Sequence, residues 1–255
     1  MILSLRVQQL LKRQAAEAAV AYIQSQSVIG LGTGSTMQFA LEALAQRLHE
    51  GTLYAVLGVP TSEATATAAR ALGIPLTTLE DSPQLALTID GADEVDPDLN
   101  LIKGLGGALL REKVVAAASA HFLVIVDESK QVQKLGSCSP LPVEVLPFGW
   151  RTHLAPLTQL GCEPHLRLHS DDTPYFSDNG NFILDCHFPD GIHDAPALAA
   201  TLDARVGVVE HGLFLGMATH VLIATLSGTH VQRRERASRA PTPPAPPTGC
   251  ATIQP

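Results

Sequence analysis

Three short segments carry the side chains that could do chemistry. The first is Gly30-Leu-Gly-Thr-Gly-Ser-Thr36. Its glycines let a ligand approach the backbone, and Thr33, Gly34, Ser35 and Thr36 offer hydroxyl and N–H donors to an anion at a helix start. A turn in which Ser35 or Thr36 merely caps the helix is an equally good reading. The dinucleotide motif would need Gly at position 35, and a P-loop would end in Gly-Lys-Ser/Thr, so neither pattern is met.

The second segment, Asp90-Gly-Ala-Asp-Glu94, gathers three carboxylates in five residues. Such crowding is costly unless a cation compensates it, and the candidates are Lys103, Arg111 and Lys113. A solvated Asp-Gly turn is the simpler interpretation of this segment alone. A metal site is a third interpretation, but no His lies nearby in the sequence and the spacing is not that of a calcium loop.

The third segment, Lys103-Gly-Leu-Gly-Gly-Ala-Leu-Leu-Arg-Glu-Lys113, joins a lysine and a glycine cluster to the start of a helix. Glu112 would lie one or two turns into that helix, facing either a cleft or solvent. In an Arg-Glu-Lys triplet, a solvated surface carboxylate is the more common case. Further on, Lys130 follows a predicted strand that ends at Val126, and it could reach an anion or cap a turn.

The elements that must position these segments alternate between strand and helix. Apolar spacing predicts helices at 5–23, 37–48, 62–72 and 108–120, and strands at 28–31, 53–59, 85–90, 122–126 and 221–225. Repeated β-α-β units favour an α/β fold, with a parallel sheet covered by helices on both faces. Sites in such sheets lie at the carboxyl ends of the strands, where the first two segments fall.

The amino-acid composition of the chain changes twice after residue 135. Residues 136–209 predict a smaller α+β unit, so the main domain is expected to comprise 1–135 and 210–229. Residues 230–255 are rich in Arg and then in Pro, which predicts a disordered tail without a core. We therefore expect deletion after about Gly228 to leave activity intact.

Composition limits the class of protein. The 255 residues are 45% hydrophobic and 16% charged, with a net charge of −8, so a nucleic-acid partner is not expected. The four cysteines are scattered and predict reduced thiols. No apolar run of about 18 residues predicts a membrane span. Cys162, His165 and His169 are spaced loosely like metal ligands, but no second cluster completes a site. We expect a cytoplasmic protein.

Six segments in this order resemble the ribose-5-phosphate isomerase A family. They are Gly-Thr-Gly-Ser-Thr, Asp-Gly-Ala-Asp-Glu, Lys-Gly-x-Gly-Gly-Ala-Leu-Leu-Arg-Glu-Lys, Asp-Glu-Ser-Lys-Gln-Val, Leu-Pro-Val-Glu-Val and Asp-Asn-Gly-Asn-Phe-Ile-Leu-Asp. The resemblance runs from the first helix to about Gly228. It implies a Rossmann-like sheet with a smaller ferredoxin-like α+β domain, no metal or cofactor, and a homo-oligomer, most simply a dimer.

The resemblance also implies roles. Glu112 corresponds to the base that moves a proton between C1 and C2 of ribose 5-phosphate and ribulose 5-phosphate, in the non-oxidative pentose phosphate pathway. Asp90, Asp93 and Lys103 would be its electrostatic and proton-transfer partners, and would also serve in opening the furanose ring. The substrate-binding set is Lys12, Thr33, Gly34, Ser35, Thr36, Asp90, Gly91, Ala92, Asp93, Lys103, Gly104, Leu105, Gly106 and Lys130.

The residue types suit that chemistry. Removing a weakly acidic proton beside a carbonyl requires a base and a charge that stabilises the enediolate oxygen. Two rival functions remain open at this stage. A nucleotide-dependent oxidoreductase could use a similar sheet, although Ser35 replaces the third glycine of its motif. A non-catalytic sugar-phosphate sensor could share the phosphate turn without needing Glu112 near Lys103.

Overall fold

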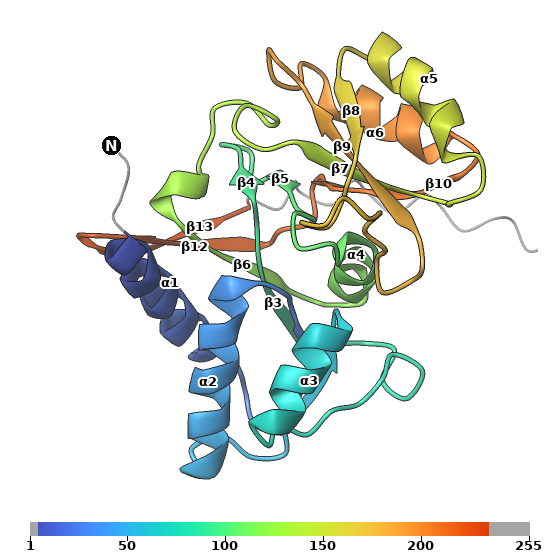
Figure 1. Ribbon diagram of the computed structural model, residues 1–255. Coiled ribbons are helices and arrows are strands. Elements are labelled where there is room, and N and C mark those ends of the chain that lie inside the picture. The colour runs from blue at the N-terminus through green and yellow to red at the C-terminus, as the bar shows by residue number, and fades with distance from the viewer. Residues whose placement is uncertain (1–4, 235–255) are drawn as a thin grey trace, which may run out of the picture.

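We describe residues 5–234 of the chain in a computed structural model (Figure 1). A six-stranded sheet has the order β13-β12-β6-β3-β1-β2. Its neighbouring strands run parallel, except that β13 is antiparallel to β12. The strands are β1 (Val28–Leu31), β2 (Leu57–Pro60), β3 (Leu87–Gly91), β6 (Phe122–Asp127), β12 (His220–Thr225) and β13 (Gly228–Arg233).

Alternation along the strands sends side chains to two apolar layers. Leu123 and Ile125 of β6 pack in the cluster formed with α1 (Leu5–Val20) and α2 (Ser35–His49). Val124, between them, packs in a cluster on the other face. Two further helices, α3 (Glu63–Ala71) and α4 (Leu109–Ala117), complete the β-α-β units. The expected α/β architecture, with a parallel sheet buried on both faces, is confirmed.

A second, antiparallel sheet has the order β10-β7-β9-β8. Its chain order is strand, helix, strand, strand, helix, strand, which is the ferredoxin-like arrangement and confirms the expected α+β unit. Its elements are β7 (Leu141–Val145), η2 (Trp150–His153), α5 (Leu154–Gln159), β8 (Glu163–Leu166), β9 (Phe182–His187), α6 (Ala195–Asp203) and β10 (Val208–His211). The last strand continues past the expected limit at residue 209.

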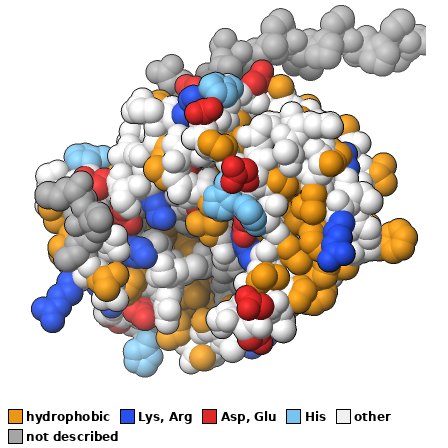
Figure 2. All heavy atoms as spheres, turned by 45° about the horizontal axis from the view of Figure 1, so that its top comes forward, with side chains coloured by type: hydrophobic (Ala, Val, Ile, Leu, Met, Phe, Trp, Pro, Cys, Tyr) orange, Lys and Arg blue, Asp and Glu red, His pale blue; other side chains and the backbone are white. Residues whose placement is uncertain are grey.

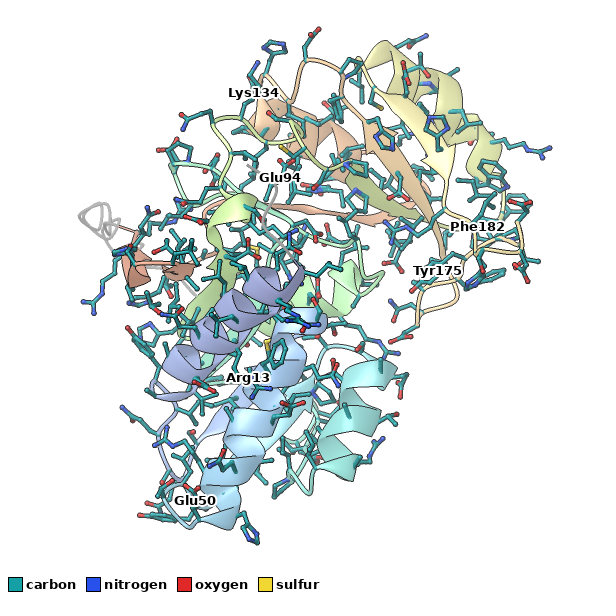
Figure 3. The ribbon with its side chains drawn as sticks, turned by 60° about the vertical axis from the view of Figure 1, so that its left-hand side comes forward. Arg13, Glu50, Glu94, Lys134, Tyr175 and Phe182 are labelled. Carbon is teal, nitrogen blue, oxygen red and sulfur yellow. The ribbon has the colours of Figure 1, made fainter. Side chains whose placement is uncertain are left out.

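A three-stranded sheet, in the order β11-β5-β4, was not predicted. It consists of β4 (Glu94–Val95), β5 (Leu101–Ile102) and β11 (Leu213–Phe214), and the turn η1 (Glu128–Lys130) follows β6. The buried carboxylate of Glu94 accepts the N–H groups of Gly136, Cys138 and Ser139 at 2.6, 2.7 and 2.5 Å (Figure 3). One buried side chain therefore fixes the backbone where the chain enters the small unit.

Three predicted boundaries differ for local reasons. The strand expected at 53–59 begins at Leu57, because Ala55 adopts a left-handed conformation with φ 52°. The helix expected at 108–120 ends at Ala117, because Leu85 and Ala120 form backbone bonds that draw the chain beside β3. The tail expected from residue 230 is wrong for its first residues, which form β13. The rest of that predicted tail, 235–255, lies outside the described residues.

Candidate active site

The glycine-rich turn joins β1 to α2. Gly34 precedes the first helical residue with φ 116°, a conformation that favours glycine, and no side chain caps the helix. The alternative that Ser35 or Thr36 serves as a side-chain cap is therefore wrong. The first N–H groups of α2 have no partner within the helix, so they remain available to an anion. Lys12 of α1 reaches the same place, with its Nζ 2.9 Å from Ser35 Oγ.

The backbone N–H and the hydroxyl of Thr33 make hydrogen bonds within the protein. Its N–H donates to Asp90 Oδ1 at 3.1 Å. Its hydroxyl lies 2.8 Å from Thr61 Oγ1, 2.8 Å from Ser62 Oγ and 3.0 Å from Thr65 Oγ1. The sequence interpretation missed this hydroxyl cluster, although Thr61 and Ser62 follow directly after the strand β2, where functional residues of a parallel sheet gather. The cluster fixes the turn, and residues 34–36 supply further donors to a ligand.

Asp90, the penultimate residue of β3, is fully buried beneath the turn. Gly32 makes room for it, because a Cβ at that glycine would lie 2.1 Å from Asp90 Oδ1. The same oxygen accepts the Gly91 N–H at 2.7 Å. A buried carboxylate needs such donors and a cation to remain charged.

Lys103, after β5, supplies that cation. Its Nζ lies 3.0 Å from Asp90 Oδ2 and 3.2 Å from Glu112 Oε2, and donates to Gly91 O at 2.6 Å. Lys103 is 3% exposed and Glu112 4%. The two carboxylate oxygens that face the ammonium make no hydrogen bond of good geometry, so they retain acceptor capacity. Arg111 and Lys113, the other candidate cations, pair with Glu63 and Glu210 instead.

The carboxyl groups resist ionisation in this surrounding. Burial, reinforced by the nearby charge of Asp90, raises the pKa of Glu112 to about 8, and Lys103 opposes the rise. Burial also raises the pKa of Asp90. Burial lowers the pKa of Lys103, but attraction to Asp90 and Glu112 outweighs this and holds that pKa above its ordinary value. Lys103 thus stays cationic while Glu112 can exchange a proton near neutral pH.

The predicted site residues surround one cavity of about 130 Å³. Asp93 lines it and also accepts the Leu105 N–H at 3.0 Å, which holds the glycine cluster in place. Asp90 lies beneath the floor, and the side chain of Leu105 is 42% exposed, so these two residues do not line the cavity. The lining is Lys12, Thr33, Gly34, Ser35, Thr36, Gly91, Ala92, Asp93, Lys103, Gly104, Gly106, Glu112 and Lys130.

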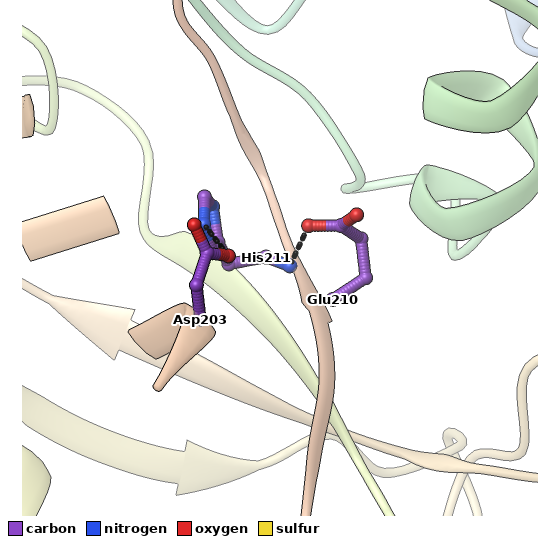
Figure 4. A group of neighbouring side chains, drawn as sticks. All are labelled: Asp203, Glu210 and His211. Carbon is purple, nitrogen blue, oxygen red and sulfur yellow. Dashed lines mark hydrogen bonds and ion pairs between the residues drawn. The ribbon is translucent and has the colours of Figure 1, made fainter. Parts of the chain in front are cut away.

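Two other features of the described chain fit chemistry less well. A cavity of about 700 Å³ lies between α3 and α4, but none of the buried carboxylate–lysine group lines it. Elsewhere, Asp203, Glu210 and His211 lie close enough to share a metal ion (Figure 4). The ammonium of Lys113 already contacts Glu210 Oε1 at 2.5 Å, so a cation from this chain occupies the position a metal would take. We assign no metal to that group.

The fold and the site define a class: an α/β protein with a buried proton-exchanging carboxyl group, a fixed cation and an anion-binding turn at one sheet edge. A family model described as ribose 5-phosphate isomerase A (phosphoriboisomerase A) matches residues 57–228. The chain belongs to this family.

Individual relatives agree. The chain is 57% identical over 219 residues to a ribose-5-phosphate isomerase A of Roseiflexus castenholzii, with 86% of this chain and 93% of the relative covered. It is 48% identical over 229 residues to a probable ribose-5-phosphate isomerase 3, chloroplastic, of Arabidopsis thaliana, with 88% and 83% covered.

Solved structures extend the likeness to the fold. A ribose 5-phosphate isomerase of Plasmodium falciparum superposes with a TM-score of 0.85 at 40% identity, and 88% of this chain and 98% of that one are covered. A D-ribose-5-phosphate isomerase in complex with phospho-erythronic acid has a TM-score of 0.85 at 38% identity, with the same coverage.

Proposed function

We propose that the chain interconverts D-ribose 5-phosphate and D-ribulose 5-phosphate through an enediolate, as an aldose–ketose isomerase of the pentose phosphate pathway. One observation carries the proposal. The carboxyl group of Glu112 lies 3.2 Å from a buried, permanently cationic Lys103, in a cavity that also contains the anion-binding turn. A base, an electrostatic partner and a phosphate site are thereby within reach of one small sugar.

Glu112 acts as the base in this proposal. Its carboxylate takes the proton from C2 of the open-chain aldose, and the electrons of that C–H bond form the C1–C2 double bond while negative charge moves to the C1 oxygen. The C2 hydroxyl proton then passes to that oxygen. Glu112 returns its proton to C1, which leaves a carbonyl at C2. A pKa near 8 makes Glu112 a stronger base than an ordinary carboxylate.

Lys103 stabilises the oxygen that becomes negative. Because its pKa is raised, it acts by charge and by hydrogen bonding rather than by giving up a proton. Asp90 holds this ammonium from below, and Asp93 faces the cavity from the loop after β3. We assign proton exchange with the sugar hydroxyls, including ring opening, to Asp93, which lines the cavity, and we assign to Asp90 an electrostatic role through Lys103.

The phosphate end is assigned to residues 34–36 with Lys12 and Lys130, which line the same cavity. Positive charge at a helix start and from two lysines favours a dianion. A related isomerase was solved in complex with phospho-erythronic acid, a ligand that combines a phosphate with a carboxyl group, so a site with two positive regions suits the family. A second anion would lie near Lys103, where enediolate charge develops.

The rival functions have less support. A dinucleotide site has less support because Ser35 stands where the dinucleotide-binding motif has its third glycine. A passive sensor would not need a buried Glu112 with a raised pKa beside Lys103, since such a group costs stability. A broad nucleic-acid surface is also unsupported, because Figure 2 shows Lys and Arg interspersed with Asp and Glu on the face in view.

The test is a coupled assay of ribulose 5-phosphate formation without added metal, on the wild type and Glu112→Gln. We expect wild-type turnover and a loss of about a hundredfold to ten-thousandfold in the variant. Glu50→Gln is the matched control, because Glu50 is exposed at the end of α2 (Figure 3) and its side chain accepts a hydrogen bond from the Gln46 side chain, far from the cavity lining. Full turnover by Glu112→Gln would remove that residue from the mechanism.

We also propose a homodimer, a cytoplasmic location and the two-domain division given above. Phe148 and Val206 are each 95% exposed, and Leu146 beside them bonds Gly207, so a second copy would gain by covering this apolar surface. The described cysteines, Cys138, Cys162 and Cys186, are free thiols, as a reducing compartment maintains them. Among residues 5–234, none of the helices combines the length and apolar character that crossing a bilayer requires. Light scattering of the purified chain tests the dimer.

A further inference from the structure

Glu112 lies between two charged neighbours on a short helix. Successive residues of an α-helix point about 100° apart, so Arg111 and Lys113 flank the buried face that carries Glu112. The start of α4 has no side-chain cap. Figure 1 shows the helix between the large sheet and the small unit, so contacts on its flanks decide how far Glu112 turns toward Lys103.

The Lys113 side chain is anchored by one segment, 210–214, which runs from the end of β10 into β11. Its Nζ contacts Glu210 Oε1 at 2.5 Å and donates to His211 O at 2.7 Å. It also lies 4.9 Å from the centre of the Phe214 ring. The ion pair is mostly shielded, with side-chain exposures of 16% and 18%. A shielded, doubly bonded ammonium fixes geometry better than an exposed pair does.

The same segment holds Lys103. The N–H of Lys103 donates to Gly212 O at 2.9 Å, and the adjoining residues Leu213 and Ile102 pair between β11 and β5. The Phe214 ring lies 5.6 Å from Lys103 Nζ, so both lysines contact this ring. At Gly212 a Cβ would lie 2.2 Å from Lys103 O, which excludes a side chain there.

The segment itself is braced. Glu210 Oε1 accepts the His211 N–H at 2.8 Å, and the His211 ring bridges Leu213 N at 3.2 Å and Asp203 Oδ1 at 3.1 Å (Figure 4). Burial, and then the charge of Lys113, lower the pKa of His211, so the ring is neutral and donates to Asp203. The charged groups around Lys113 are therefore Glu210 and Asp203, both outside the cavity.

We propose that the segment 210–214 positions the catalytic pair, with Lys113 as a positioning residue that acts through Glu112. By holding the backbone of Lys103 and the side chain of Lys113, the segment sets the 3.2 Å approach of Lys103 to Glu112. This inference rests on the proposed isomerase function for its kinetic consequences. Its structural consequence, the distance between Lys103 and Glu112, can be tested without measuring activity.

The experiment compares Glu210→Gln, Lys113→Met and the double variant, measuring kcat, KM and the carboxyl titration of Glu112 by NMR in the ligand-free protein. We expect kcat to fall about tenfold to a hundredfold, with KM nearly unchanged. The double variant should be no worse than Lys113→Met, because the two residues act as a unit. Lys113→Arg should recover part of the loss.

Glu210→Gln separates positioning from a direct charge effect. Removing a negative charge would by itself lower the pKa of Glu112. Loosening the approach of Lys103, the group that opposes the effects of burial, Asp90 and Asp93, would raise it. We expect a rise. Lys134→Met is the matched control, because the Lys134 ammonium also bonds a backbone carbonyl, that of Asp190, at 3.0 Å (Figure 3).

Each outcome is decisive. If folded Glu210→Gln keeps wild-type kcat, or its Glu112 titration moves downward or not at all, the positioning role is wrong. If the wild type itself has no isomerase activity, the proposed function fails, and the titration alone still decides the positioning role. A variant that only loses thermal stability, with unchanged titration, would show that Lys113 merely stabilises the fold.

Discussion

Asp90 and Glu112 share one buried ammonium, that of Lys103, at 3.0 and 3.2 Å. Two carboxylates and one cation leave an excess of negative charge in a place that water hardly reaches. The group therefore holds a proton more tightly than ordinary carboxyl groups would. That proton is the one that an isomerase needs to move.

The pH dependence of activity should reflect this. The base form of Glu112 is required, and its pKa in the free protein is about 8, so kcat/KM should rise with pH toward that value. The pair with Asp90 titrates jointly, so the measured midpoint belongs to the group. A pH–rate profile from pH 5 to 9.5 checks this, and a limb that is complete by pH 5 would contradict it.

Stability should fall as pH rises, whereas activity should increase. The pKa of Glu112 in the folded protein is raised above the ordinary 4.5. The favourable contribution of its protonated form to the free energy of unfolding is therefore fully present below about pH 4.5 and is lost as pH rises to about 8. Glu112→Gln has no such proton to lose. The urea midpoint of the wild type should therefore fall relative to that of the variant between about pH 4.5 and 8. If the two midpoints change with pH in the same way, ionising the buried Glu112 carboxyl does not destabilise the protein.

Lys103→Met should be the most damaging single substitution in the site. It leaves two buried carboxyl groups without a cation, a change that typically costs about 3–5 kcal/mol. The loss should be smaller at pH 5 than at pH 8.5, because the carboxyl groups become neutral as pH falls. Urea unfolding at both pH values measures it, with Lys134→Met as the control. An equal loss at both would mean that charge is not the cause.

The chain order of the strands and the cluster of site residues could be predicted from the sequence. Turns at strand ends, such as 32–36 and 90–93, must meet at one edge of a parallel sheet, and they do. The burial of Glu112 could not be predicted from its triplet, because the inward face of α4 depends on packing against β3, β7 and β10, and the last two lie far along the chain. Strands of two residues, such as β11, carry no periodic signal.

The position at which the folded domain ends also could not be predicted from the sequence. The expectation that deletion after about Gly228 leaves activity intact stays a prediction, but that deletion would remove β13, which pairs with β12 from Gly228 to Arg233. Deletion after Arg234 should preserve activity and thermal stability. Deletion after Gly228 exposes the edge of β12 and should lower the melting temperature by several degrees. Calorimetry of both truncations measures this, and equal melting temperatures would show that β13 contributes nothing.

Substitution of Lys12 should affect substrate binding and leave the proton-transfer step nearly unchanged. Its Nζ lies 2.9 Å from Ser35 Oγ at the start of α2, where we assign the phosphate, and Lys12 is not among the largest causes of the raised pKa of Glu112. Lys12→Met should raise KM roughly tenfold, the value of one charged hydrogen bond, and change kcat little. Arg13→Met is the matched control, since Arg13 (Figure 3) pairs with the half-buried Glu42 and packs on Phe39. A fall in kcat at constant KM would place Lys12 in the proton-transfer step, and the phosphate would then have to be held by the turn and Lys130 alone.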